Sequence, residues 1–225
     1  MAVDKPPGLL VHRTGLDAGE TQFALQLLRD QLGRPVWPAH RLDKGTSGVL
    51  LFALDADTAR ALGQAFEAPD TLQKTYLAVV RGWPPQAGLI DHPLKRLDDD
   101  ARPGRDEVQD AQTRYRTLEH YELPLPYGTF ASTRCARVEL QPLTGRRHQL
   151  RRHLKHIAHP IIGDATHGKG PLNRAVAGLL GLQRLWLHAT RLTLAHPVDA
   201  RPLVLTAPPG PEWRAWEQHQ VGAAD

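Results

Sequence analysis

The order of helical and strand patterns along the chain most constrains its fold. Apolar residues recur at helical spacing in some stretches and alternate, or form short runs, in others, but no regular strand–helix–strand unit repeats. The predicted helices are Thr21–Leu32, Asp55–Phe66, Arg147–Ile157 and Asn173–Leu182, with Trp213 and Trp216 in a final helical turn or two. The predicted strands are Val49–Leu54, Thr75–Arg81, Ala111–Thr117, Phe130–Leu140, Leu185–His188, Leu192–Ala195 and Leu203–Thr206. This irregular mixture favours an α+β fold over a doubly wound α/β fold.

The connecting segments and the cysteine content narrow the class of protein. Asp91–Asp110 is polar and contains two prolines, which predicts a loop, but no segment has the composition of a linker, so we expect one domain over residues 1–225. The lone Cys135 excludes a disulfide framework and a cysteine-rich zinc site. The longest apolar run, Val49–Leu54, is too short to cross a bilayer, and the first residues do not resemble a signal peptide. We therefore expect a cytoplasmic protein without a membrane segment.

Positive charge is concentrated in one stretch. The net charge is only +4, but residues 144–159 carry five Lys or Arg side chains, four His side chains and no acid. Arginine outnumbers lysine, and its planar fork suits phosphate. A helix entered through Thr144 and Gly145 offers backbone N–H groups and cations to a phosphate. The alternative is a solvent-facing basic helix with no ligand.

Three other kinds of site are disfavoured. Gly163–Lys169 matches the start of a phosphate loop, but Gly170 stands where that loop needs Ser or Thr. The four histidines of residues 148–159 have no acidic or cysteine partner nearby, and five cations there would repel a metal ion, so we predict no metal site. Ser47 does not lie in the G-x-S-x-G pattern of serine hydrolases.

The segment His40–Gly48 has the composition of a reactive loop. It precedes a predicted buried strand and places Asp43 directly before Lys44 and two positions after Arg41. A carboxylate flanked by cations stays ionised and can act as a nucleophile or base. The alternative is a surface turn held by salt bridges.

Five segments together resemble the RluA-type pseudouridine synthase family. His40–Asp43 with Thr46–Gly48 resembles its HRLD-x-x-TSG signature. The other matching segments, in the order of the family, are Lys5–His12, Lys74–Gly82, Leu143–Arg151 followed by His159–Asp164, and Leu187–Ala189. The resemblance runs from residue 3 to about residue 207. It implies the pseudouridine-synthase fold, with a mixed, mainly antiparallel central sheet, flanking helices and a central cleft.

The resemblance also implies a reaction and its residues. The family isomerises uridine in RNA to pseudouridine without a cofactor or metal. Asp43 matches its essential aspartate. Arg151 matches the arginine that pairs with this aspartate, and we expect the pair to be bidentate. Tyr76 matches the tyrosine whose ring stacks on uracil and whose hydroxyl can take a proton. Arg41 matches the arginine that fills the space left by the flipped base. Further RNA contacts are expected from Lys74, Arg146, Arg147 and His148.

A narrower resemblance points to tRNA. His167 stands where most of the family has Tyr, and together with Arg151–Leu154 and Gln183–Leu185 it resembles the members that act on uridine 65 of tRNA. We expect a monomer that grips RNA without an appended S4-like domain. Family members usually have another strand before the segment at Lys5, so the sheet is expected to lack an edge strand unless the natural chain begins earlier. Two alternatives stay open, a ribosomal RNA pseudouridine synthase and a non-catalytic RNA-binding protein.

Overall fold

Strands hold more of the described residues than helices do. The computed structural model describes residues 1–13, 19–68, 72–97 and 107–222. Its strands are β1 (Ala2–Lys5), β2 (Trp37–Pro38), β3 (Ser47–Ala53), β4 (Leu72–Arg81), β5 (Ala87–Asp91), β6 (Leu94–Lys95), β7 (Val108–Gln109), β8 (Gln112–Leu123), β9 (Thr133–Pro142), β10 (Leu187–Ala195), β11 (Pro202–Thr206) and β12 (Gln220–Val221). Its helices are α1 (Ala24–Leu32), α2 (Ala56–Glu67), α3 (Gln149–His156), α4 (Gly170–Leu180) and the 3-10 helix η1 (Pro211–His219).

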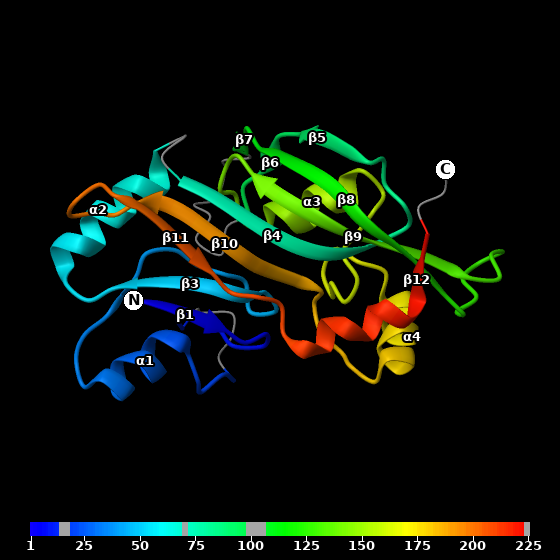
Figure 1. Ribbon diagram of the computed structural model, residues 1–225, viewed down its shortest axis with the longest axis horizontal. Helices are drawn as coiled ribbons and strands as arrows, with labels where there is room; N and C mark the ends of the chain where they lie inside the picture. The colour runs from blue at the N-terminus through cyan, green and yellow to red at the C-terminus, as the bar shows by residue number, and fades with distance from the viewer. Residues whose placement is uncertain (14–18, 69–71, 98–106, 223–225) are drawn as a thin grey trace.

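Ten strands form one mixed sheet. Its hydrogen-bonded order is β1-β3-β10-β4-β9-β8-β12, while β2, β11 and β5 pair with β3, β10 and β8. The β3–β10 pairing is parallel, and the other pairings between the described strands are antiparallel. Figure 1 shows α1 and α2 near one end of the sheet and α3, α4 and η1 near the other. The predicted α+β fold with a mixed, mainly antiparallel sheet is confirmed.

Gly48 permits the one parallel pairing of the sheet. Its φ is +108°, and Ala189 of β10 lies directly opposite it. A Cβ atom at position 48 would overlap the backbone carbonyl of Ala189, so a residue without a side chain is required here. This close approach brings β10 against the start of β3, directly after the loop that carries Asp43.

Both faces of the sheet are covered. Side chains alternate along β4, so Ala78 and Val80 contribute to one buried cluster and Val79 to another. Helix α3 packs Leu150 and Leu154 into the first cluster. Helices α4 and η1 cover the other side, where the largest buried side chains include Trp186, Trp213 and Trp216. The two faces thereby fix the position of α3 above β4 and β9, with the first turn of α3 beside the Asp43 loop.

The end of the sheet near the N-terminus is built around β3. All seven residues of β3 are buried, as the apolar run predicts. Leu28 of α1 packs with Leu50 and Phe52, and Leu62 of α2 packs with Leu51 on the opposite face. Helix α2 begins after Asp55, whose carboxylate accepts a hydrogen bond from the Thr58 N–H at 2.8 Å and so caps the helix.

Several elements differ from the prediction. Leu185–His188 and Leu192–Ala195 belong mainly to one strand, β10, because a bulge between Ala189 and Arg191 interrupts the apolar pattern without ending the pairing. The predicted loop Asp91–Asp110 contains the small β6–β7 hairpin, and residues 98–106 of it lie outside the described residues. Strands β1, β2, β5 and β12 were not predicted. Among the described residues, none of the helices is long and apolar enough to cross a membrane.

Candidate active site

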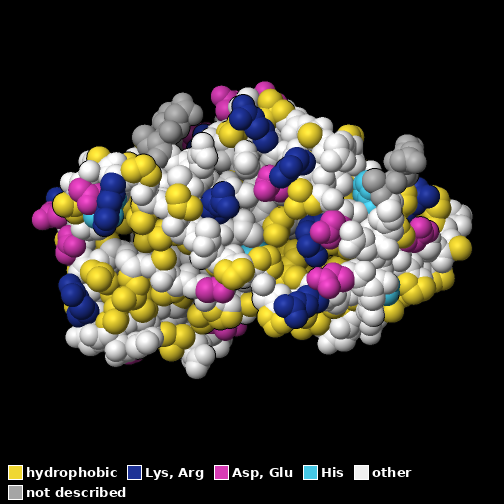
Figure 2. Space-filling view, in the orientation of Figure 1, with side chains coloured by type: hydrophobic (Ala, Val, Ile, Leu, Met, Phe, Trp, Pro, Cys, Tyr) yellow, Lys and Arg dark blue, Asp and Glu magenta, His cyan; other side chains and the backbone are white. Residues whose placement is uncertain are grey.

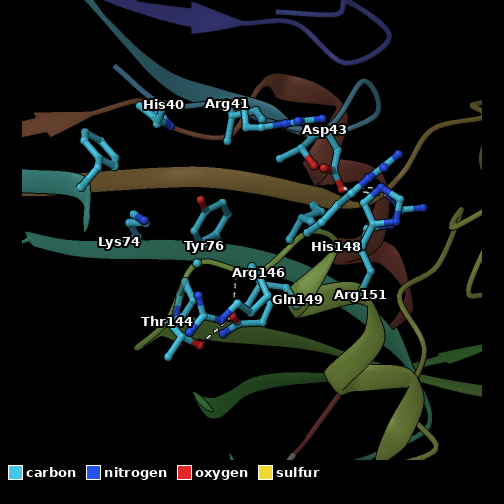
Figure 3. Close-up of a pocket in the computed structure, with 18 of the residues that line it drawn as sticks. His40, Arg41, Asp43, Lys74, Tyr76, Thr144, Arg146, His148, Gln149 and Arg151 are labelled. Carbon is cyan, nitrogen blue, oxygen red and sulfur yellow. Dashed lines mark hydrogen bonds and ion pairs between the residues drawn. The ribbon is translucent and has the colours of Figure 1, made fainter. Parts of the chain in front are cut away.

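One pocket collects every residue that the sequence predicts for the site. It has a volume of about 450 Å³ and is lined by the loop after β2, by β4, by the segment that leads from β9 into α3, and by α3 itself. Figure 3 shows Asp43, His148 and Arg151 at one end, Tyr76 in the middle and Lys74 toward the other end. The predicted residues that line it are Arg41, Asp43, Lys74, Tyr76, Arg146, Arg147, His148 and Arg151. We call this space the Asp43 pocket.

Asp43 is reachable but largely enclosed. Its side chain is 21% exposed, and its backbone carbonyl accepts the Thr46 N–H at 3.0 Å, which closes a turn before β3. Arg151 Nη1 lies 2.9 Å from Asp43 Oδ2. His148 Nε2 lies 3.8 Å from the same oxygen, within ion-pair range but beyond a hydrogen bond. Two nitrogen-bearing groups therefore approach one side of the carboxylate.

Arg151 does not form the expected bidentate pair with Asp43. It donates from Nε to Asp164 Oδ2 and from Nη2 to Asp164 Oδ1, both at 2.8 Å, and only Nη1 reaches Asp43. Burial alone would lower the pKa of Arg151, but these hydrogen bonds outweigh it and raise the pKa. Arg151 is therefore a permanent cation between two carboxylates, and the two-pronged pair belongs to Asp164.

Asp164 is the main residue of the site that sequence reasoning left without a role. Its side chain is fully buried, and its Oδ1 also accepts the backbone N–H groups of Thr166 at 2.9 Å and His167 at 2.8 Å. Burial alone would raise the pKa of Asp164, yet the hydrogen bonds from Arg151 and from these amides outweigh it and lower the pKa. The available signal for this role was the position of Asp164 at the end of a segment that matches the family. Its sequence context, directly after Gly163, is instead typical of a turn.

The same amides are bonded within the protein, so the phosphate-loop pattern of Gly163–Lys169 does not present them to a phosphate. The Thr166 and His167 N–H groups are directed to the side chain of Asp164, and the Gly168 N–H to its backbone carbonyl at 3.1 Å. The loop is thus wrapped around its own carboxylate. Gly163 has a φ of +80°, and a Cβ there would overlap the backbone of Arg184.

Tyr76 and Lys74 extend from β4 into the pocket. Burial, with a smaller contribution from the charge of Asp43, raises the pKa of the Tyr76 hydroxyl well above its ordinary value, so the phenol stays neutral at physiological pH. Burial lowers the pKa of Lys74, whose Nζ lies 5.0 Å from the centre of the Phe66 ring. The pocket therefore offers an aromatic face between a carboxylate at one end and an amine at the other.

Gln149 holds the segment that leads into α3. Its Oε1 accepts Thr144 Oγ1 at 2.7 Å and the Arg146 N–H at 3.0 Å, and its Nε2 donates to Gln112 O and Thr113 Oγ1. The helix begins at Gln149 rather than at the predicted Arg147, because His148 has a left-handed backbone with φ 54°. The Arg146 N–H is thus bonded within the protein rather than offered to a phosphate.

The remaining cations sit at the margin of the pocket. Arg41 is exposed, and Figure 3 shows it reaching over the pocket toward Asp43. Arg146 Nε donates to Asp110 O at 3.0 Å, and Arg147 Nη1 donates to Leu97 O at 3.3 Å. By contrast, the face in Figure 2 shows basic and acidic side chains interspersed, with no patch of one sign. The lining of the Asp43 pocket holds five Lys or Arg side chains and one acid.

Ser47 cannot serve as a nucleophile even though a histidine contacts it. Ser47 is 4% exposed, and its Oγ lies 2.8 Å from His188 Nδ1 and 2.7 Å from Arg184 Nη2. The other ring nitrogen of His188 lies 2.9 Å from Ala207 O. Because no substrate can reach this buried network, its role is structural. Within the described ranges, no group of three or more His, Cys, Asp or Glu side chains is placed to hold a metal ion.

Comparisons with known proteins point to one family. The family model "RNA pseudouridylate synthase" matches residues 1–156. The chain is 49% identical over 211 residues to a protein from Vibrio cholerae named "tRNA pseudouridine synthase C", covering 92% of this chain and 86% of that protein. It is 47% identical over 222 residues to a protein of the same name from Pasteurella multocida, covering 95% and 89%.

A solved structure has the same fold. It is named "Human RNA Pseudouridylate Synthase Domain Containing 4", superposes with a TM-score of 0.70 at 30% identity, and is matched over 96% of this chain and 88% of that one. A match over 96% of this chain leaves few of its residues outside the shared fold.

Proposed function

This chain belongs to the RNA pseudouridylate synthase family, and we propose that it converts uridine 65 of tRNA to pseudouridine, with Asp43 as the nucleophile. The observation that carries this proposal is the carboxylate of Asp43, held by Arg151 at 2.9 Å at the end of an open pocket. Relatives named for tRNA, 44–49% identical to this chain, support the choice of RNA. The reaction is an isomerisation, so it needs no oxidant, reductant or second substrate.

The bonds in the reaction define what the pocket must do. The N1–C1′ glycosidic bond of uridine breaks, the uracil rotates, a C5–C1′ bond forms, and the proton on C5 leaves while N1 gains one. Asp43 attacks either the ribose carbon or the base and is released when the C–C bond has formed. Arg151 keeps the carboxylate ionised and aimed, since a cation within hydrogen-bond distance favours the charged form.

The other residues receive roles that fit their positions. The ring of Tyr76 stacks on the uracil, and its hydroxyl takes part in the final proton transfer. Arg41, which is exposed at the mouth of the pocket, occupies the space that the flipped nucleotide leaves in the RNA. Lys74, Arg146, Arg147 and His148 border the path of the RNA backbone. We also propose that the enzyme is cytoplasmic, and that it is a monomer that grips the RNA with its catalytic domain. Light scattering of the purified protein and of its RNA complex tests the monomeric state.

The test maps pseudouridine directly. Bulk tRNA and ribosomal RNA from cells that lack the enzyme are incubated with wild type or with Asp43→Asn and read by carbodiimide-stop sequencing. The expected result is a new stop at position 65 of tRNA with wild type only. A stop that appears only with wild type and only in ribosomal RNA would support the proposed chemistry and contradict tRNA as the substrate. Conversion by Asp43→Asn contradicts the nucleophile, and Asp57→Asn, an exposed site in α2, serves as the control for the substitution.

A further inference from the structure

His148 lies between the carboxylate of Asp43 and the ring of His167. Its Nε2 is 3.8 Å from Asp43 Oδ2, and its Nδ1 is 3.1 Å from His167 Nε2. The two rings meet edge to face, with centroids 5.3 Å apart and an angle of 77° between their planes. Figure 3 shows His148 beside Asp43 and Arg151 at the end of the Asp43 pocket. Contacts between side chains therefore lead from Asp43 in the pocket, through His148, to His167 in the loop after Gly163.

Both rings are neutral at physiological pH. Burial lowers the pKa of His148 to about 4. The charge of Asp43 opposes this shift, and Arg151, His167 and Arg147 add to it. Burial also lowers the pKa of His167, with Asp164 opposing the shift and Arg151, Lys155 and Arg152 adding to it. These are the charged and titratable groups that act on the pair. The variable is therefore the position of one proton on each ring, not the charge of either ring.

Counting protons leaves two arrangements. A neutral imidazole has one N–H, so one of the two facing nitrogens donates and the other accepts. If His148 Nδ1 donates, its Nε2 is a bare lone pair that faces the Asp43 carboxylate, which is repulsive. If His167 Nε2 donates, His148 keeps its proton on Nε2 and presents that N–H toward Asp43 Oδ2. The second arrangement places opposite partial charges together and is favoured.

We propose that His167 is a positioning residue for Asp43, which it serves by holding His148 in the tautomer that carries its proton on Nε2. Arg151 Nη1 and the His148 N–H then act on the same oxygen, Oδ2, so that Oδ1 is the oxygen that attacks. The loop gives His167 a fixed place, because its backbone N–H is bonded to the buried Asp164 at 2.8 Å. This inference rests on the proposed nucleophilic role of Asp43.

The test compares two substitutions that differ in one donor. Gln in place of His167 can present its side-chain N–H where His167 Nε2 lies, whereas Phe keeps a flat ring without a donor. Long-range proton–nitrogen spectra of the 15N-labelled full chain report the ring tautomer of His148, assigned by comparison with His148→Gln. We expect the proton on Nε2 in wild type and His167→Gln, and a shift toward Nδ1 or a mixture in His167→Phe. A proton on Nδ1 in wild type, or an unchanged tautomer in His167→Phe, overturns the proposal.

Single-turnover kinetics on tRNA give the second readout. His167→Phe is expected to lower the rate constant at saturating enzyme about tenfold, as small displacements of a reactive group do, with unchanged RNA affinity. His167→Gln is expected to restore it to within about threefold. His156→Phe, at the end of α3 and with its ring stacked on that of His92 at a centroid distance of 3.6 Å, is the control and should keep the wild-type rate. A wild-type rate in His167→Phe overturns the inference. An inactive wild type contradicts the proposed function, and the tautomer spectra alone then test the contact between His148 and His167.

Discussion

Asp164 accepts two hydrogen bonds from Arg151, one from Nε and one from Nη2, and both measure 2.8 Å. The Nε and Nη2 edge of the guanidinium is thus held by a fully buried carboxylate. Only Nη1 is left to point at Asp43. The orientation of the Arg151 guanidinium beside Asp43 is therefore set by a residue that does not line the Asp43 pocket.

Replacing Asp164 with Asn should damage both stability and turnover. The substitution leaves Arg151 with one carboxylate in place of two and removes an acceptor from a buried loop. Breaking a buried ion pair from one side typically costs about 3–5 kcal/mol, so urea unfolding should show a loss of this order. At a temperature where the variant is folded, we expect single-turnover isomerisation to fall about a hundredfold because the aim of Arg151 is lost. Wild-type turnover in folded Asp164→Asn would show that Asp43 needs no such support.

The two roles that we propose for Tyr76 can be separated by substitution. Tyr76→Phe keeps the ring for stacking but removes the hydroxyl, so RNA affinity should be close to wild type while turnover falls by about 10²–10⁴, the usual contribution of a proton-transfer group. Tyr76→Leu should weaken both. Filter binding and single-turnover assays measure the two effects. Undiminished turnover in Tyr76→Phe would leave stacking as the only role of the residue.

The comparison of sequence with structure shows where local patterns suffice. Asp55 and the apolar stripe after it predict α2 because capping and periodicity are local properties. Asp43 and Arg151 are 108 positions apart, and no local pattern signals their contact, so their pairing was expected from family resemblance and not from spacing. The role of Asp164 escaped because a buried carboxylate in a turn has the sequence of an exposed one. Short edge strands such as β1 depend on their partners for hydrogen bonds and lack a pattern of their own.

Arg147 provides a test of the RNA path. If it contacts one phosphate, Arg147→Ala should weaken tRNA binding and reduce the slope of log K against log salt by about 1, since one counterion fewer is released. Arg214→Ala, an exposed arginine of η1 that does not line the Asp43 pocket, is the matched control and should leave the slope unchanged. An unaltered slope in Arg147→Ala would remove this residue from the interface.

The buried histidines predict that the protein loses stability in mild acid. Burial is the main cause that lowers the pKa of His40 to about 3, of His148 to about 4, and of His153 and His188 below the ordinary 6.5. Below about pH 6.5 the unfolded chain binds protons that the folded protein does not, so the free energy of unfolding should fall as pH drops from about 6.5 toward 4.

The share of one histidine in this loss can be measured. Each histidine that stays neutral only in the folded state contributes up to about 1.4 kcal/mol per pH unit in that window. His153 is fully buried, with Nε2 3.0 Å from His92 O and Nδ1 2.9 Å from Thr113 Oγ1. His153→Gln keeps a donor for His92 O but cannot titrate, so urea unfolding at about pH 7.5 and about pH 5 should show a smaller difference than in wild type. An equal difference in the two proteins would mean that His153 takes up its proton as easily in the folded state as in the unfolded chain.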